Sequence, residues 1–436
     1  MRDHPAVLRL AVVRFAGQFG DGMFQAALSG AILFNPERET DPLAIAAGFA
    51  VLLLPYSLIG PYAGALLDRW DRRNVLLVAN ASRAVLIGVV TLGLLAGIGE
   101  TPLLLLALAV VGVSRFVMAG VSAALPRVLA QQWLVPMNSV LATVASACAG
   151  LGAAMAVAII GLVGAGDTGS AVAVAASGAG SIASAVIALR FRPRVLGPAP
   201  GTSAGSSAIH AIATGLRTGA RAVWQSAQVT TAMIGIGTHR IVFGGNTLLM
   251  VLVLRQPRTG GSGLGSGLVG FGVAIAATAT GMLVAAAVAP LLIPRWGRPR
   301  TVIAGLCTAA VVQVTLVTPI AVADAGAALQ RAHELLLLGA FFFGLAGQTI
   351  KLTGDATMQI DIDDARRGQV FALQDTVFNI AFVLAIATAA LIIPPDGRSL
   401  PLVIAGAVIY CCGIAAVLLV LRRGPAQDRR KLSALG

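Results

Sequence analysis

Four polar side chains recur at helical spacing in the first long apolar run of the sequence. Arg14, Gln18, Asp21 and Gln25 are four, three and four positions apart, so they share one face of a helix. If the run crosses a membrane, each ionisable group in it costs about 2.5–3.5 kcal/mol on insertion scales, which makes it a candidate for function. Asp21, near the middle of the run, could bind a proton or the cationic group of a ligand. The alternative is a fixed ion pair, with Arg14 or with another helix.

A second group of candidates occurs in the seventh and eleventh apolar runs. Asp375 and Asn379 lie one helical turn apart, while His239, Arg240 and Asn246 lie in the earlier run. Asp375 is the second candidate for proton binding, and pairing with Arg240 is the alternative. An unperturbed histidine titrates near neutral pH, so His239 could relay protons. A buried, hydrogen-bonded histidine is the simpler explanation of His239.

The tenth apolar run contains a third set. Gln348, Lys351 and Asp355 share a helix face at spacings of three and four residues. Lys351 and Asp355 fall towards the cytoplasmic end of the run, where opposite charges one turn apart pair with each other. This spacing favours a gate or a structural ion pair over a proton-binding site.

The chain lacks the motifs of soluble enzymes. The segment GSGLVG at 265–270 matches a dinucleotide-binding pattern, but it opens an apolar run and follows no strand. The four histidines are too scattered to build a metal site, and the four cysteines all fall in apolar runs. No P-loop occurs, which argues against ATP as the direct energy source. We therefore expect no enzyme activity, no cofactor and no metal.

The elements that position these side chains follow from composition. The chain has 436 residues, of which 57% are hydrophobic and 11% charged, and its mean hydropathy is +0.88. Soluble domains are about 45–50% apolar and about 25% charged. A helix needs ~20 apolar residues to span a bilayer, and twelve runs meet this need, which predicts an all-α membrane protein. The runs are 7–34, 44–66, 74–97, 102–124, 137–163, 169–190, 226–254, 265–292, 301–322, 333–357, 368–393 and 399–421.

Basic residues predict the orientation of these spans. Most of the 31 Lys and Arg residues fall in alternate loops, which share one side of the membrane. Cytoplasmic loops carry an excess of positive charge, so we expect both termini in the cytoplasm. The same distribution explains the net charge of +13 without nucleic acid as a partner.

The spans divide into two sets of six that carry an internal repeat. The motif Arg-Trp-x-Arg occurs at 69–72 and at 295–298, after the second span of each set. Two related halves with a site near the midplane between them form a transporter architecture. We therefore expect twelve transmembrane helices in two pseudo-symmetric six-helix bundles. The expected domains are an N-terminal bundle, a cytoplasmic linker, a C-terminal bundle and a basic tail, at 1–190, 191–225, 226–421 and 422–436.

The linker contains one amphipathic segment. Residues 193–207 predict a flexible connection, and residues 208–224 predict a short helix. A basic amphipathic helix in this place is expected to lie on the inner membrane surface and to tether the bundles. Its expected apolar face consists of Ile209, Ile212, Leu216, Ala220 and Val223.

The loop after the second span carries a family signature. Residues 64–76 read GALLDRWDRRNVL, close to the pattern G-x-L-a-D-r-x-G-r-[RK]-x-x-l, with Asp71 in place of the usual glycine. With twelve spans around this loop, the chain resembles the major facilitator superfamily over its whole length. The resemblance implies a latch that clasps the two halves in the outward-open state. The implied latch residues are Gly64, Asp68, Arg69, Arg72 and Arg73, together with Arg115 of the fourth span.

Three looser segments resemble macrolide-efflux-like drug exporters: RFAGQFGD at 14–21, ALP at 124–126 with Asn138 and Ser139, and RRGQVF at 366–371. This resemblance implies a secondary transporter of a bacterial inner membrane that exports small amphipathic molecules in exchange for protons. We also expect it to be monomeric. The fifth span lacks the proline of the exporters' G-P-x-x-G-G motif. Uptake or exchange of a metabolite, and movement of lipids or other amphiphiles between leaflets, are therefore the alternatives.

Overall fold

The computed structural model describes a helical protein. The described residues are 5–33, 42–43, 45–51, 70–129, 131–164, 166–197, 208–255, 267–323 and 326–433, and every regular element in these ranges is a helix. Within them, ten helices are long and apolar enough to cross a membrane. The 29-residue helix α1 (Pro5–Leu33) carries the polar stripe of the first span. Most of the expected second span lies outside the described residues.

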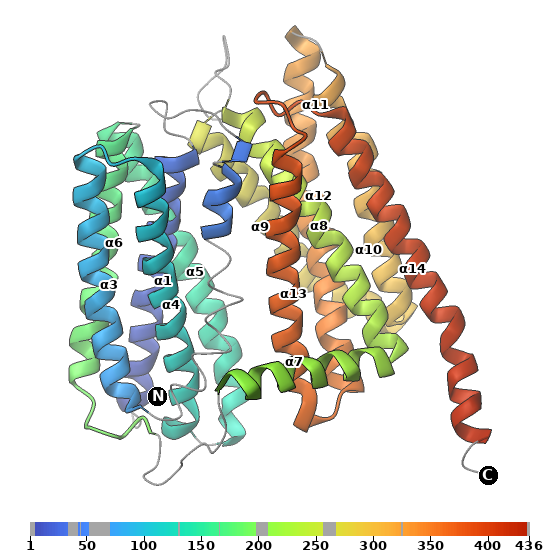
Figure 1. The fold of residues 1–436 in the computed structure, drawn as a ribbon, viewed down its shortest axis with the longest axis horizontal. Coiled ribbons are helices and arrows are strands. Elements are labelled where there is room, and N and C mark those ends of the chain that lie inside the picture. The colour runs from blue at the N-terminus through green and yellow to red at the C-terminus, as the bar shows by residue number, and fades with distance from the viewer. Residues whose placement is uncertain are drawn as a thin grey trace. The chain divides into compact units, whose positions relative to one another are not determined.

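The chain forms two compact units, Met1–Glu39 with Ala47–Ile212 and Thr40–Ala46 with Ala213–Gly436. We call them the N-terminal and C-terminal units. In the first, α1 packs against α5 and α6, and α3 packs against α4 and α6. The described helices that join α1 in this unit (Figure 1) are α3 (Arg72–Leu95), α4 (Glu100–Val128), α5 (Gln131–Val163) and α6 (Asp167–Leu189).

Small residues allow α1 to approach its neighbours closely. A Cβ atom added to Gly152 of α5 would collide with backbone atoms of Phe19 in α1. On α6, a Cβ atom added to Gly180 would collide with the carbonyl group of Ala16 in α1. Close backbone approach through small residues drives helix association in membranes, where lipid supplies no hydrophobic force between helices. These contacts hold α1 against α5 and α6.

The C-terminal unit repeats the helix packing of the N-terminal unit. In it, α8 packs against α13 and α14, and α10 packs against α12 and α14. These pairs correspond in chain order to α1 with α5 and α6, and to α3 with α4 and α6. A five-residue π-helix, Gln313–Val317, joins α10 to α11 inside the ninth span. The helices from the linker onward are α7 (Ala208–Gln225), α8 (Ala227–Arg255), α9 (Gly267–Trp296), α10 (Arg298–Val312), α11 (Thr318–Val322), α12 (Gly326–Asp361), α13 (Asp364–Ala390) and α14 (Leu400–Ser433).

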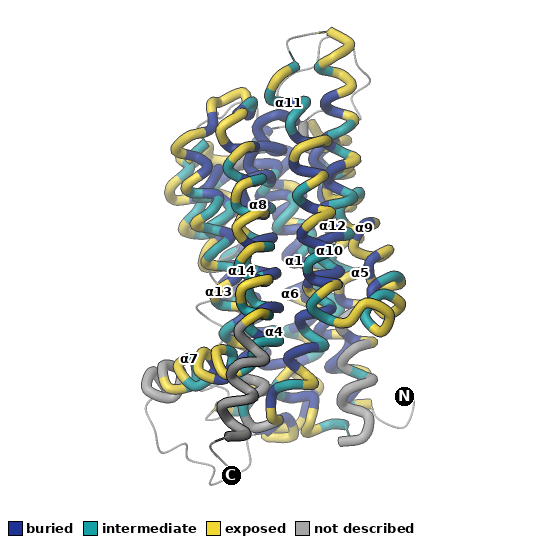
Figure 2. Tube along the Cα trace, turned by 90° about the vertical axis from the view of Figure 1, so that its right-hand side faces the viewer, coloured by how far each residue is buried: buried dark blue, intermediate teal, exposed yellow. Residues whose placement is uncertain are grey.

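The amphipathic segment of the linker forms α7, one residue longer than predicted. Gly219 packs against α13, where an added Cβ atom would lie 2.8 Å from the carbonyl oxygen of Gln369. Ala220, expected on the apolar face, is exposed, whereas the neighbouring Gly219 is buried. Exposed, half-buried and buried positions alternate along α7 (Figure 2). The side chains of Ile209 and Ile212 lie outside the described part of the chain. The place of α7 on the membrane surface stays a prediction.

Replacing Gly152 by alanine is expected to destabilise the protein, because the new methyl group must push α5 away from the backbone of α1. Overpacking of this kind costs about 1–3 kcal/mol. Gly150→Ala in the same helix is the matched control, since an added Cβ atom there meets nothing within 4 Å. Thermal melting of the purified protein in detergent should show a lower midpoint for G152A alone. Equal midpoints for the two variants would contradict the close packing of α1 on α5.

Candidate functional site

Asp21 of α1 is bonded to two other helices. Its Oδ1 atom lies 2.6 Å from Nη2 of Arg83 in α3 and accepts a 2.6 Å hydrogen bond from the hydroxyl of Ser114 in α4. Its Oδ2 atom accepts a 2.9 Å hydrogen bond from Nε2 of Gln18 in α1. Arg83 is 1% exposed and Asp21 6% exposed. The ion pair is therefore excluded from solvent and joins α1, α3 and α4.

The partner of Asp21 is Arg83 rather than Arg14. Arg14 is buried in the same helix, and Gln25 is half-buried, so the polar stripe of α1 faces the protein. Of the two alternatives for Asp21, this geometry favours the fixed interhelical pair. Helical spacing could not identify Arg83, because spacing relates residues of one helix and Arg83 lies on another.

A cavity of about 300 Å³ lies among α8, α9, α12 and α13 of the C-terminal unit. Six of the residues singled out from the sequence line it: His239, Arg240, Gln348, Lys351, Asp375 and Asn379. They come from α8 and from the consecutive helices α12 and α13. Apart from Asn246 and Asp355, the second and third groups of candidates thus meet at one place.

The charged groups at this cavity differ in how they are paired. Nζ of Lys351 donates a 2.7 Å hydrogen bond to Oδ2 of Asp355, as the spacing of these residues predicted. Gln374 of α13 donates a 3.2 Å hydrogen bond to the other oxygen of Asp355. Arg240 and Asp375 lie within electrostatic range of each other. Among the described residues, however, no ion pair joins Arg240 to Asp375, so the expected alternative for Asp375 is not formed.

Aromatic rings hold Arg240 and His239 in place. The guanidinium carbon of Arg240 lies 4.9 Å from the ring centroid of Phe382 in α13, within range of a cation–π interaction. The rings of Phe382 and Phe243 are 6.1 Å apart, and Phe243 stacks on His239 at 5.8 Å. These contacts orient both basic side chains along the wall of the cavity.

His239 is buried and bonded to α14. Its Nδ1 atom is hydrogen-bonded to the hydroxyl of Tyr410 at 3.1 Å. A Cβ atom added to Gly347 of α12 would collide with the imidazole ring, so this approach requires glycine. His239 thus matches the simpler prediction of a hydrogen-bonded buried histidine. Tyr410 had no sequence signal, because a single tyrosine in an apolar run does not indicate its partner.

Asn246, a candidate from the same span as His239, is not among the residues that line this cavity. Its Nδ2 atom donates a 2.6 Å hydrogen bond to Oε1 of Gln313, the first residue of the π-helix. Gln313 in turn donates to the carbonyl oxygen of Val403 in α14 at 3.2 Å. Two helical turns separate Asn246 from His239, which places it at the level of the π-helix. Its role is to join α8 to the π-helix and α14.

Two relatives with similar sequences show the family to which this chain belongs. The chain is 43% identical over 426 residues to the uncharacterized MFS-type transporters Rv0037c of Mycobacterium tuberculosis and Mb0038c of Mycobacterium bovis, and each match covers 97% of this chain and 93% of the relative. The chain belongs to the major facilitator superfamily. It is therefore a multi-pass membrane transporter of a small molecule and not an enzyme. No family model matches the chain.

Solved transporter structures share the fold of this superfamily member. The nucleoside transporter NupG matches with a TM-score of 0.65 at 13% identity, over 95% of this chain and 98% of that chain. The peptide transporter POT in complex with sulfate matches with a TM-score of 0.66 at 14% identity, over 97% and 94%. At these identities the likeness shows the fold alone. The macrolide-efflux-like branch stays a prediction.

A residue of the superfamily's signature loop caps the N-terminus of α3. Asp71, which replaces the usual glycine, accepts 3.1 Å hydrogen bonds from the backbone N–H groups of Arg73 and Arg194. It thereby caps α3 and holds the segment after α6, which explains the departure from the family pattern. Arg115 is half-buried in α4. Three latch residues lie outside the described part of the chain: Gly64, Asp68 and Arg69.

The second arginine of each Arg-Trp-x-Arg repeat anchors the start of a helix. Nη1 of Arg72 donates a 2.8 Å hydrogen bond to the carbonyl oxygen of Ala123, near the end of α4. Its counterpart Arg298 pairs with Asp361 at the end of α12, also at 2.8 Å. Arg73 donates to the carbonyl oxygen of Leu189, the last residue of α6, and to that of Phe191 just after it. These described contacts lie within single units, so a latch between the halves stays a prediction.

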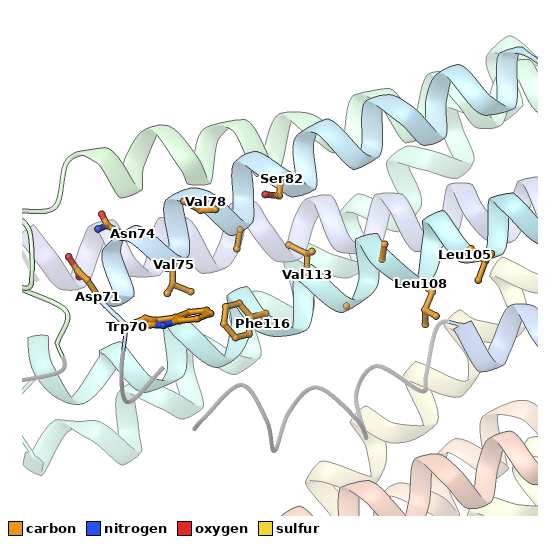
Figure 3. A pocket seen from close by; sticks show the side chains of 13 residues that line it. Trp70, Asp71, Asn74, Val75, Val78, Ser82, Leu105, Leu108, Val113 and Phe116 are labelled. Atoms are coloured by element: carbon orange, nitrogen blue, oxygen red, sulfur yellow. The ribbon is translucent and has the colours of Figure 1, made fainter. Parts of the chain in front are cut away.

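A larger hollow of about 1000 Å³ lies against α3 and α4 of the N-terminal unit (Figure 3). Its described lining is almost entirely apolar, and the rings of Trp70 and Phe116 meet edge to face at 6.4 Å. The ionisable residue on its described wall, Asp71, already caps α3. Residues 52–69, which directly precede this wall in the sequence, lie outside the described part of the chain. We assign this hollow no function.

Replacing Asp21 by asparagine is expected to destabilise the protein by about 3–5 kcal/mol, because Arg83 would remain buried without a counter-charge. The double variant D21N/R83M should lose less stability than the sum of the two single variants, since the two residues act as a pair. Thermal melting in detergent measures all three variants.

The control for this experiment is Arg366→Gln, which removes an exposed ion pair with Asp363. An exposed pair contributes at most about 1 kcal/mol, so R366Q should melt close to the unmodified protein. Unchanged stability of D21N, combined with lost transport, would contradict the structural role of Asp21 and favour the proton-binding alternative.

Proposed function

We propose that this protein is a secondary active transporter that exports a small amphipathic molecule in exchange for protons. The observation that carries the proposal is Asp375, an exposed carboxylate on the wall of the C-terminal cavity. In transporters of this architecture, two bundles move around a site near the midplane, which opens to each side of the membrane in turn. A carboxylate at such a site can take up a proton on one side and release it on the other.

The charges around Asp375 support this role. It faces Arg240 from α8 and Lys351 and Asp355 from α12. Lys351 and Asp355 are bonded to each other, and no ion pair in the described structure holds Asp375. Asp21, by contrast, is committed to a buried ion pair. We therefore assign proton binding to Asp375 and a structural role to Asp21.

The cavity wall supports an amphipathic substrate. Phe243, Phe343 and Phe378 line it together with the amide side chains of Gln348 and Asn379. Ligand pockets of about 300–1,000 Å³ commonly combine an apolar wall with a few polar groups that fix orientation. This cavity is at the small end of that range, which suits a small molecule.

The membrane potential can drive the exchange, and the sequence favours its direction. Each charge that crosses the membrane contributes ~2.3 kcal/mol per 100 mV. The resemblance of residues 14–21 and 366–371 to macrolide-efflux-like exporters supports export. The positive-inside distribution of Lys and Arg supports cytoplasmic termini, and the resemblance to the exporters supports a bacterial inner membrane. We propose that the monomer carries out this exchange.

Inside-out vesicles with an acidic lumen test the exchange. A panel of small amphipathic molecules is first screened by thermal shift on the purified protein at an acidic and an alkaline pH. The compound that stabilises the protein most is then supplied outside the vesicles. We expect it to accumulate in the lumen while protons leave, and we expect a protonophore to collapse the accumulation. Accumulation in right-side-out vesicles alone would indicate uptake instead.

Replacing Asp375 by asparagine is expected to reduce gradient-driven accumulation to the level of vesicles without protein. The amide cannot bind and release a proton, although D375N should still allow the compound to equilibrate down its own gradient. Asp396→Asn is the matched control, because Asp396 contacts the backbone of Arg398 in the loop after α13, outside the cavity. Proton-driven accumulation that persists in D375N would refute the assignment of Asp375.

A further inference from the structure

Among the described residues, two opposite charges at the C-terminal cavity form no ion pair. Arg240 of α8 and Asp375 of α13 both line the cavity and lie within electrostatic range of each other. In the described structure, no carboxylate lies within ion-pair distance of Arg240 and no cation within that distance of Asp375. Lys351, the third charge on the wall, is already paired with Asp355. The cavity therefore presents one positive and one negative group at separate places.

Arg240 is positioned to bind an anionic group. Its guanidinium plane is supported by the ring of Phe382 at 4.9 Å, and a cation–π contact leaves the N–H groups at the edge of the plane able to donate. No acceptor among the described residues takes these N–H groups. The forked donors of a guanidinium match the paired oxygen atoms of a carboxylate or a phosphate.

Asp375 is positioned to bind a cationic group. Asp375 is exposed as a residue and lines the cavity, and Asn379 lies one turn further along α13 on the same cavity wall. A substrate ammonium group at this place would compete with a proton for the same carboxylate oxygen atoms. Such competition is what an exchange of substrate for protons requires.

Phenyl groups form the rest of the binding surface. Phe243, Phe343 and Phe378 line the cavity that Arg240 and Asp375 share. Aromatic side chains bury large apolar areas and prefer stacked or edge-to-face contacts with other rings. The wall is therefore complementary to an apolar or aromatic body that carries the two charged groups.

We infer that the substrate is an amphipathic zwitterion, whose anionic group binds Arg240 and whose cationic group binds Asp375. The inference rests on the proposed function and adds the chemical class of the substrate. A purely cationic molecule would be repelled by Arg240, and a purely anionic molecule would be repelled by Asp375. A molecule that carries both charges can place its anionic group at Arg240 and its cationic group at Asp375.

Four probes that differ in charge test this inference on the purified full-length protein. The zwitterions are phenylalanine and para-(aminomethyl)phenylacetate, whose charges are close together in the first and a ring's length apart in the second. The singly charged probes are phenylethylamine and phenylpropionate. In isothermal titration at neutral pH, we expect one zwitterion to bind at least about tenfold more tightly than either singly charged probe, a difference of about 1.4 kcal/mol.

Two variants separate the contributions of the charges. Arg240→Gln should remove the advantage of the zwitterion over phenylethylamine, and Asp375→Asn should remove its advantage over phenylpropionate. Arg240→Lys keeps the charge without the fork and should retain part of the advantage. Arg331→Gln is the matched control, because Arg331 is exposed in α12 and does not line the cavity. Melting curves verify that each variant is folded.

Zwitterions that bind no more tightly than the singly charged probes would overturn this inference, as would equal losses for all probes in R240Q. Neither result affects the proposed exchange, which the vesicle experiment tests through proton movement. Conversely, charge-selective binding with transport that ignores the pH gradient would refute the exchange and leave the substrate class in place.

Discussion

A charged side chain inside a membrane bundle depends on the protein for its partner, because lipid offers neither counter-charge nor hydrogen bonds. In the N-terminal unit this constraint is met by Asp21 and Arg83, whose contact at 2.6 Å is supported by Ser114 and Gln18. Breaking either side would leave a buried charge. The pair therefore commits α1, α3 and α4 to one arrangement, and the glycine contacts that bring α5 and α6 against α1 are compatible with it.

The two units share the same order of helix packing but differ in how their membrane-embedded charges are paired. Their helices pair in the same order, and the arginine that starts α3 or α10 is anchored in both. The central acid of α1 is neutralised and buried, whereas Arg240 and Asp375 line a cavity without pairing with each other. A charge that is already paired gains little from a ligand. Among the described residues, Arg240 and Asp375 form no ion pair, which is why we propose that ligand-binding energy is available at these two charges.

Part of this organisation could be predicted because it is local. Apolar runs predicted the described spans, since a helix that crosses lipid must be apolar along its length. The spacing of Lys351 and Asp355 predicted their ion pair, and the periodicity of the linker predicted α7 to within one residue. The apolar face of α7 was less well predicted, since Ala220 is exposed. Which residues of α7 are buried depends on its contact with α13, and the periodicity of a single segment does not predict that contact.

By itself, the sequence determined that this protein is a helical membrane transporter, and it identified most of the polar residues worth locating. Only the tertiary structure decided how they are used: Asp21 pairs with Arg83, His239 with Tyr410, and Asn246 with Gln313. The physical reason is the distance along the chain over which sequence spacing is informative. Spacing along a helix reports neighbours within a few turns, whereas each of these partners lies on a different helix and is chosen by the angle and distance at which two helices pack.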